Sequence, residues 1–164
     1  MKIIANLPNG VKAKRRDESV PLWRQLNSTA SVLMAVRSGE SGTNAIKLVE
    51  PALRPGVQSL SFHVWRWLGT AQVIRGMLAK RAPAAQVDAL LCVALTLLCF
   101  DTPVFAKTDA GTDVEHFGQH YDVFTLVDQA VEAAKRNPNT KASSSFINAC
   151  LRRFLREKDA LTAE

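Results

Sequence analysis

The sequence predicts an all-α domain, a bundle of about seven helices, and three observations lead to this fold class. Apolar residues recur at three- and four-residue spacing along most of the 164-residue chain, which is the period of an amphipathic helix. Residues 87–100 are apolar almost all round, as expected of a helix at the centre of a bundle. No stretch alternates apolar and polar residues as a half-buried strand would.

The chain begins with residues 1–18, which mix Pro and Gly with Lys and Arg and show no apolar period. Such a composition predicts a flexible basic arm. The helical domain is expected over residues 19–164. Ser19 can cap its first helix, Pro21 suits the first turn, and the apolar stripe ends near Gly39.

The next segments predict three further helices. Thr43 is expected to cap a short helix that runs to about Leu53. Pro55 opens another helix, in which Gly69 permits a break or a kink. A separate helix is then expected to run to about Arg81.

After the central apolar helix, residues 101–121 hold two Gly and several acids without a clear period, which predicts a long surface insertion. The following helix shows a stripe of Phe124, Val127, Ala130, Val131 and Ala134. A turn at 137–139 leads to the last helix, whose apolar face comprises Phe146, Ile147, Cys150, Leu151, Phe154 and Leu155.

The last helix also carries a basic face made by Arg152, Arg153 and Arg156. Guanidinium offers a fixed fork of donors that matches two phosphate oxygens, so nucleic acid is a candidate partner. The alternative is a packed helix with a solvated basic face.

Charge is segregated along the chain, which has a net charge of +6. Residues 1–24 contain six Lys or Arg against two acids, whereas residues 101–134 contain one Lys against seven acids. This segregation favours an electrostatic contact with a polyanion, although surface lysines also serve solubility.

Composition also predicts the compartment. The three Cys show neither a close pair nor metal-ligand spacing, so they are expected to be reduced and buried in a cytoplasmic protein. The first residues lack a signal peptide, and the longest apolar run is too short to span a bilayer.

Motifs for catalysis are scarce. The chain has no glycine-rich nucleotide loop and no serine-nucleophile elbow. His116 and His120 have the spacing of a metal-binding pair, but Gly118 between them disfavours a rigid helix, so no metal site is expected. His63 is expected to be packed or half-exposed, and Cys150 to be unreactive.

Three segments together resemble the NusB-like helical domain: residues 87–100, 126–135 and 146–152. The second reads Leu-Val-Asp-Gln-Ala-Val-Glu-Ala-Ala-Lys where the family pattern is similar to Ile-Asn-Glu-Ala-Val-Glu-Leu-Ala-Lys. The third reads Phe-Ile-Asn-Ala-Cys-Leu-Arg where the pattern is similar to Phe-Val-Asn-Gly-Val-Leu-Arg. The resemblance covers about residues 22–157. Asp128 and Ala149 depart from the usual Asn and Gly.

The resemblance implies one of two settings. Residues 60–68 and 149–157 look like the N-terminal domain of a bacterial 16S ribosomal RNA cytosine-C5 methyltransferase. That setting implies ribosomal RNA and a C-terminal catalytic domain as partners. This chain has neither the Pro-Cys nor the Thr-Cys catalytic segment, so S-adenosylmethionine is expected only in an absent catalytic domain. The alternative is a free-standing transcription antitermination factor, which binds RNA together with a small ribosomal-subunit protein.

The resemblance places the RNA surface on the arginine-rich N-terminal segment, here Lys12, Lys14, Arg15, Arg16 and Arg24. Physical grounds add Arg152, Arg153 and Arg156. Asn148 occupies a family motif position, but a mid-helix Asn is expected to bond to a neighbouring loop. A protein-interaction module stays open as an alternative, and salt dependence separates it from RNA binding.

Overall fold

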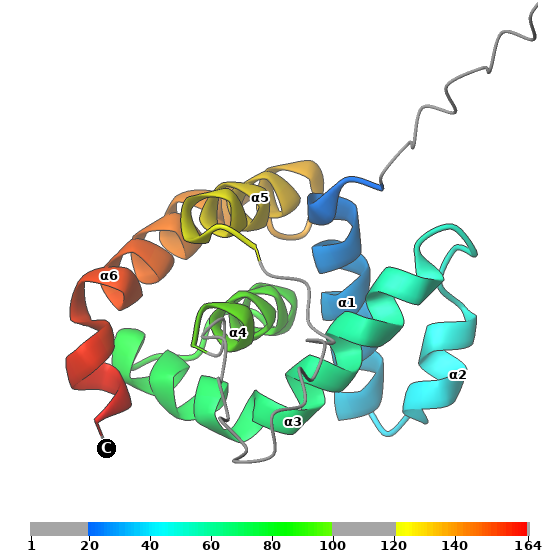
Figure 1. Ribbon diagram of the computed structural model, residues 1–164, viewed down its shortest axis with the longest axis horizontal. Coiled ribbons are helices and arrows are strands. Elements are labelled where there is room, and N and C mark those ends of the chain that lie inside the picture. Colours follow the sequence, from blue (N-terminus) through cyan, green and yellow to red (C-terminus); the bar gives the residue numbers. More distant parts are fainter. Residues whose placement is uncertain (1–19, 100–120, 164) are drawn as a thin grey trace, which may run out of the picture.

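The computed structural model describes residues 20–99 and 121–163, and all regular structure in these two ranges is helical. The α-helices, in chain order, are α1 (Leu22–Arg37), α2 (Gly42–Lys47), α3 (Arg54–Leu78), α4 (Ala85–Cys99), α5 (Val123–Arg136) and α6 (Ser144–Thr162), and the 3-10 helix η1 (Lys141–Ser143) precedes α6 (Figure 1). The predicted fold class is confirmed. The predicted arm and nearly all of the predicted insertion lie outside the described residues.

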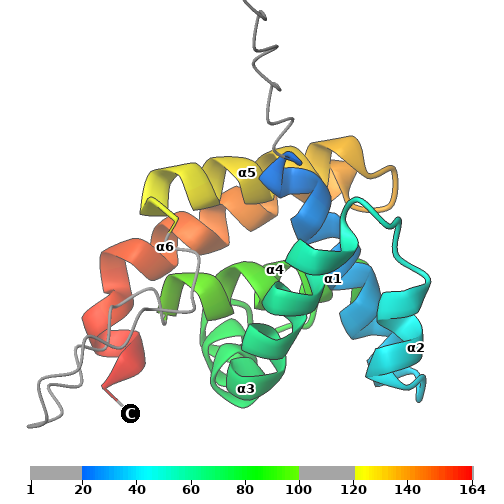
Figure 2. The same ribbon diagram turned by 45° about the vertical axis from the view of Figure 1, so that its right-hand side comes forward.

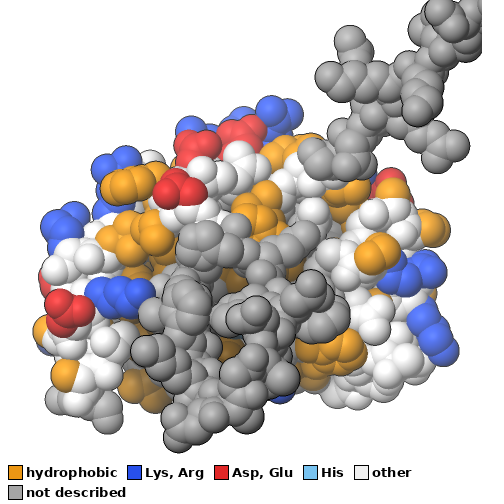
Figure 3. All heavy atoms as spheres, in the orientation of Figure 1, with side chains coloured by type: hydrophobic (Ala, Val, Ile, Leu, Met, Phe, Trp, Pro, Cys, Tyr) orange, Lys and Arg blue, Asp and Glu red, His pale blue; other side chains and the backbone are white. Residues whose placement is uncertain are grey.

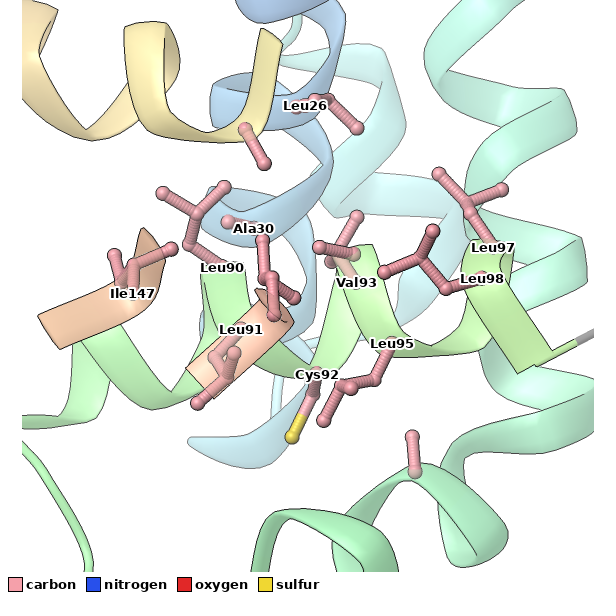
Figure 4. Packing of buried hydrophobic residues seen from close by; sticks show 14 of the residues in the cluster. Leu26, Ala30, Leu90, Leu91, Cys92, Val93, Leu95, Leu97, Leu98 and Ile147 are labelled. Atoms are coloured by element: carbon pink, nitrogen blue, oxygen red, sulfur yellow. The ribbon is translucent and has the colours of Figure 1, made fainter. Parts of the chain in front are cut away.

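Helix α4 lies at the centre of the bundle (Figures 1 and 2). It contacts α1, α3, α5 and α6, and every residue from Ala89 to Cys99 is buried. Figure 4 shows Leu26 of α1 and Ile147 of α6 among the α4 side chains Leu90 and Val93. The helix predicted to be apolar on all sides is therefore the one surrounded by the others, because each of its faces needs an apolar neighbour.

Helices α5 and α6 run side by side as an antiparallel pair (Figures 1 and 2). Thr140 stabilises the turn between these two helices, because its hydroxyl donates to the Ala134 carbonyl oxygen at 2.8 Å. Helix α1 is joined to this pair by the Asn27 side-chain amide, which donates to the Ala133 carbonyl oxygen at 2.9 Å. The two segments with the family-like pattern at 126–135 and 146–152 thus lie on neighbouring helices.

Helix α3 runs without interruption through Gly69, so the prediction of two helices in this region is wrong. Its buried stripe continues on both sides of that glycine, with Val64 before it and Ala71 after it. Packing of this stripe on α4 outweighs the cost of about 1 kcal/mol for a glycine in a helix interior. The helix ends at Leu78 rather than near Arg81.

Two helix starts also differ from the prediction. Ser41, not Thr43, caps α2, because the Ser41 hydroxyl oxygen accepts from the Asn44 amide at 3.3 Å. Pro21 is the N-cap of α1 rather than a residue of its first turn. Gly39 does mark the end of α1, where its φ of 99° is a conformation that side-chain-bearing residues avoid.

Two aromatic residues predicted to be part of apolar faces are exposed. Phe124 at the start of α5 is 79% exposed, and Phe146 near the start of α6 is 38% exposed. Each lies in the first turn of its helix, before the buried residues of that helix begin. The inward face of α5 is formed by Leu126, Val127, Ala130, Ala133 and Ala134.

We predict that Leu95→Ala lowers the free energy of unfolding by about 2–5 kcal/mol, since the removed atoms leave a cavity in the fully buried centre of α4. Leu48→Ala is the matched control, because Leu48 is 85% exposed and its truncation should change stability by less than about 0.5 kcal/mol. Urea unfolding followed by circular dichroism measures both. Equal effects of the two variants would contradict the central position of α4.

Candidate nucleic-acid interface

Four of the eight predicted RNA contacts, Lys12, Lys14, Arg15 and Arg16, lie outside the described residues. Arg24 lies in the first turn of α1, and its Nη2 is 2.6 Å from Oε2 of Glu50. Both side chains are substantially exposed, at 39% and 53%. An exposed pair of this kind contributes little to stability and opens at small cost. Arg24 therefore stays accessible to a phosphate that competes with the carboxylate.

Arg152 and Arg156 lie on the outer side of α6, one helical turn apart, and both are exposed. The opposite side of the helix buries Ile147, Leu151 and Phe154 in the core. The Nε of Arg152 donates to Oδ1 of Asn148 at 3.1 Å. This bond uses one of the five guanidinium N–H groups, so the terminal nitrogens remain able to grip an anion.

The contact made by Asn148 differs from the expected bond to a neighbouring loop. Its side chain accepts from Arg152 on the same helix instead. The bond joins two side chains on the outer side of α6 and is exposed to solvent. This one-turn spacing within a helix is the separation at which side chains meet.

Arg153 is the least available of the α6 arginines. Its Nε donates to both carboxylate oxygens of Glu157 at 3.1 Å. Its Nη1 donates to the carbonyl oxygen of Leu78 at 3.3 Å, at the last residue of α3. Helix ends leave carbonyl groups without intrahelical partners, so Arg153 satisfies one of them. The pair with Glu157 is exposed, at 43% and 41%, and opens as easily as that of Arg24, so it is the bond to Leu78 that ties Arg153 to the bundle.

The structure adds Trp23 and Arg136, which sequence reasoning missed. The Arg136 guanidinium carbon lies 5.4 Å from the centre of the Trp23 ring, and its Nε is 2.6 Å from Oε1 of Glu132. Trp23 and Arg136 join α1 to α5, whereas Arg24 pairs with Glu50 between α2 and α3, so the two arginines lie on different sides of α1. Local sequence gives no sign of this aromatic contact, because Trp23 and Arg136 are on helices at opposite ends of the sequence.

The positive charge does not depend on the N-terminal segment. The described residues contain 15 Lys or Arg against 8 Asp or Glu. Figure 3 shows Lys and Arg side chains in separate groups, both on the side of the molecule where α6 lies and on the side where α2 lies, with Asp and Glu side chains among them. Such a distribution suits several separate phosphate contacts better than a single small anion.

The densest group of charged side chains joins three helices. Asp88 of α4 has its Oδ2 2.9 Å from Nη1 of Arg37 on α1 and its Oδ1 2.7 Å from Nε of Arg75 on α3. The second contact is an ion pair by distance but lacks the angle of a hydrogen bond. The Cys92 thiol lies 3.9 Å from the same carboxylate. Because Asp88 occupies both guanidinium groups, this cluster is better suited to holding helices than to binding phosphate.

The cysteines are free and buried. Burial raises the pKa of all three thiols, and that of Cys99 to about 11. The charge of Asp88 adds to the effect at Cys92, while Arg37 opposes it. A nucleophilic cysteine needs a lowered pKa and access, so none of these thiols has the setting of a catalytic group.

The remaining candidate residues are His63 and those that could bind a metal ion. The Nε2 of His63 lies 3.2 Å from the Thr96 carbonyl oxygen, which confirms a packed histidine. Within residues 20–99 and 121–163, no three His, Cys, Asp or Glu side chains gather as metal ligands would. His116 and His120 lie outside the described residues.

In the same part of the chain, no helix is both long and apolar enough to cross a bilayer.

Comparison with known proteins returns no assignment: no family model matches the chain, and no curated protein is similar to it.

We predict that Asp88→Asn lowers the free energy of unfolding by about 2 kcal/mol, because it leaves Arg37 and Arg75 without a counter-charge. The loss is smaller than the 3–5 kcal/mol of a fully buried pair, since the three side chains are 14–28% exposed. Asp128→Asn on the exposed side of α5 is the control, and urea unfolding measures both. Equal stability of the two variants would show that the cluster does not hold the helices.

We predict that Cys99 reacts slowly with iodoacetamide in the folded chain, since a thiol of pKa about 11 has roughly one part in a thousand of thiolate at pH 8. Mass spectrometry should show rapid labelling only after unfolding in urea. Because folding raises this pKa, the stabilising effect of the neutral thiol is present below pH 9 and is lost as the pH rises through about 11. Rapid labelling of the native chain would reopen a catalytic role.

Proposed function

We propose that this chain is a non-catalytic RNA-binding domain, which positions the separate catalytic domain of a ribosomal RNA cytosine-C5 methyltransferase on small-subunit ribosomal RNA. The main support for RNA binding is that Arg152 and Arg156 are both exposed on α6. The opposite face of this helix is buried in the core. Rigid placement matters, because a preordered cation loses less conformational entropy on binding.

The spacing of the pair suits a phosphate chain. Four residues separate the two arginines, a rise of about 6 Å along the helix, so both can reach phosphates of the same strand. Phosphate contacts supply affinity without reading the base sequence. A domain that only brings an enzyme to folded RNA needs this kind of contact, and it needs no active site of its own.

A second contact is proposed at the start of α1. Arg24 lies in the first turn of α1, and Arg136 lies over the half-buried ring of the preceding residue, Trp23. Residues 12–16 precede this region in the chain and contain four of the cations that the resemblance assigns to RNA binding. RNA held between this region and α6 would cross the α5–α6 side of the molecule.

The methyltransferase setting is supported by resemblance alone, and the alternative is a free-standing antitermination factor. Both settings use the same RNA surface. They differ in the second partner, which is a catalytic domain that binds S-adenosylmethionine in one and a small ribosomal-subunit protein in the other. In the methyltransferase setting the reaction is assigned to the separate catalytic domain, because the described thiols of this chain lack a nucleophile's environment.

We predict that replacing Arg152 and Arg156 together by Ala reduces the magnitude of the slope of log affinity against log salt by about 1.4 to 1.8, since two phosphate contacts are lost. The measurement is a salt titration on one small-subunit ribosomal RNA hairpin, with circular dichroism to confirm equal helix content. Replacement of both residues by Lys should keep most of the slope, because lysine retains the charge.

Two further variants serve as controls for this experiment. Arg66→Ala removes an exposed cation on α3 and should leave the slope unchanged. Arg153→Ala should lower thermal stability with little change in the slope, because this side chain bonds to Glu157 and Leu78. If the Arg152 and Arg156 variant bound RNA with the same slope and affinity as the unchanged chain, the α6 surface would be wrong.

A further inference from the structure

The outward side of α3 shows a regular pattern that core packing does not use. Phe62, Arg66, Gly69, Val73 and Gly76 follow one another at alternating steps of four and three residues, and all five are exposed. This alternation places the five residues on one line along the helix, which is the arrangement that a second helix would contact. The opposite face of α3 packs on α4, so these five residues, here called the α3 seam, form its free side.

The α3 seam offers apolar anchors of fixed geometry. Phe62 is 55% exposed and Val73 is 59% exposed. The Phe62 ring meets the Trp65 ring edge to face, with centres 5.5 Å apart and an interplanar angle of 69°. Trp65 in turn packs against α2 near Gly42. An exposed aromatic ring that is already held in place gains contact area on binding at low entropic cost.

The two glycines of the seam, Gly69 and Gly76, have no side chain, which leaves the backbone of α3 open to close approach there. A Cβ added at Gly69 or Gly76 would meet no atom within 4 Å, and neither residue has a positive φ. Neither the backbone nor internal packing therefore requires glycine at these positions, although glycine weakens a helix. Small residues on a helix surface permit another backbone to approach closely, which explains their place between Phe62 and Val73.

The charge of α3 narrows the choice of partner. Its 25 residues include no Asp or Glu and three arginines. Arg54 bonds to the carbonyl oxygens of residues 47 and 49 and Arg75 pairs with Asp88, so the exposed cation of α3 is Arg66. Arg66 lies within the seam, between Phe62 and Gly69. A second copy of α3 would bring arginine against arginine and supply no carboxylate. A partner with acidic side chains beside its own apolar stripe complements both the charge and the shape.

We propose that the α3 seam is a docking site for an acidic amphipathic α-helix of another protein, with Phe62 and Val73 as anchors, Gly69 and Gly76 as the points of close approach, and Arg66 as the partner of a carboxylate. This site is separate from the RNA surface proposed on α6 and α1. Its occupant is a protein helix rather than a nucleic acid, because the seam has two exposed apolar anchors and one cation only.

The test uses a labelled synthetic helical peptide of about four heptads, with Ala and Leu at the seam positions and Glu at the flanking positions. A matched peptide carries Lys in place of Glu. Fluorescence anisotropy with the full chain should give micromolar binding of the Glu peptide and at least about tenfold weaker binding of the Lys peptide. Equal affinities, or no binding of either peptide at millimolar concentration, would overturn the proposal.

Substitutions in the chain sharpen the test. Phe62→Ala should weaken binding of the Glu peptide by about tenfold or more, and Arg66→Glu should reverse the preference between the two peptides. Replacing Gly69 and Gly76 by Ala should raise the melting temperature by a few degrees while weakening binding, since the added methyl groups favour the helix but block close approach. Thr70→Ala, on the exposed flank of the same helix, is the control.

Two measurements identify other occupants. Sedimentation velocity of the full chain shows whether it self-associates, and loss of that association in Phe62→Ala would assign the seam to a second copy. The RNA hairpin titration shows whether the seam binds nucleic acid, because Phe62→Ala would then lower RNA affinity. Either result would overturn the proposal and leave the α6 surface untouched.

Discussion

Burial of α4 on all sides is the constraint on which the rest of the structure depends. Helix α4 is apolar on all sides, so α1, α3, α5 and α6 each place an apolar stripe against it. The side of each helix that packs on α4 also decides which of its residues face solvent. Because Leu151 and Phe154 of α6 are drawn into the core, Arg152 and Arg156 must lie on the outside.

The ends of the helices are tied by polar contacts at the rim of this core. Asp88 joins α4 to α1 and α3 at one end. At the other end Lys158 donates to the Leu98 carbonyl oxygen at 3.0 Å, and so links α6 to the end of α4. Partly buried contacts of this kind fix the relative positions of helices whose apolar faces alone would tolerate some sliding.

The sequence predicted the fold class and the central helix because apolar periodicity records which side of a segment is buried. It failed where tertiary context decides. Gly69 suggested a break, but a buried stripe on both sides keeps α3 continuous. The role of Arg153 could not be predicted, since its partner Leu78 is on another helix. The contact of Trp23 with Arg136 was missed for the same reason.

The four cations of α6 divide into two kinds, and this division has a consequence for how the surface can vary. Arg153 and Lys158 hold the ends of α3 and α4, so their replacement disturbs the bundle. Within residues 20–99 and 121–163, Arg152 and Arg156 make no hydrogen bond to another helix. Substitutions at Arg152 and Arg156 can therefore raise or lower the affinity of the helix for a polyanion without destabilising the helix bundle.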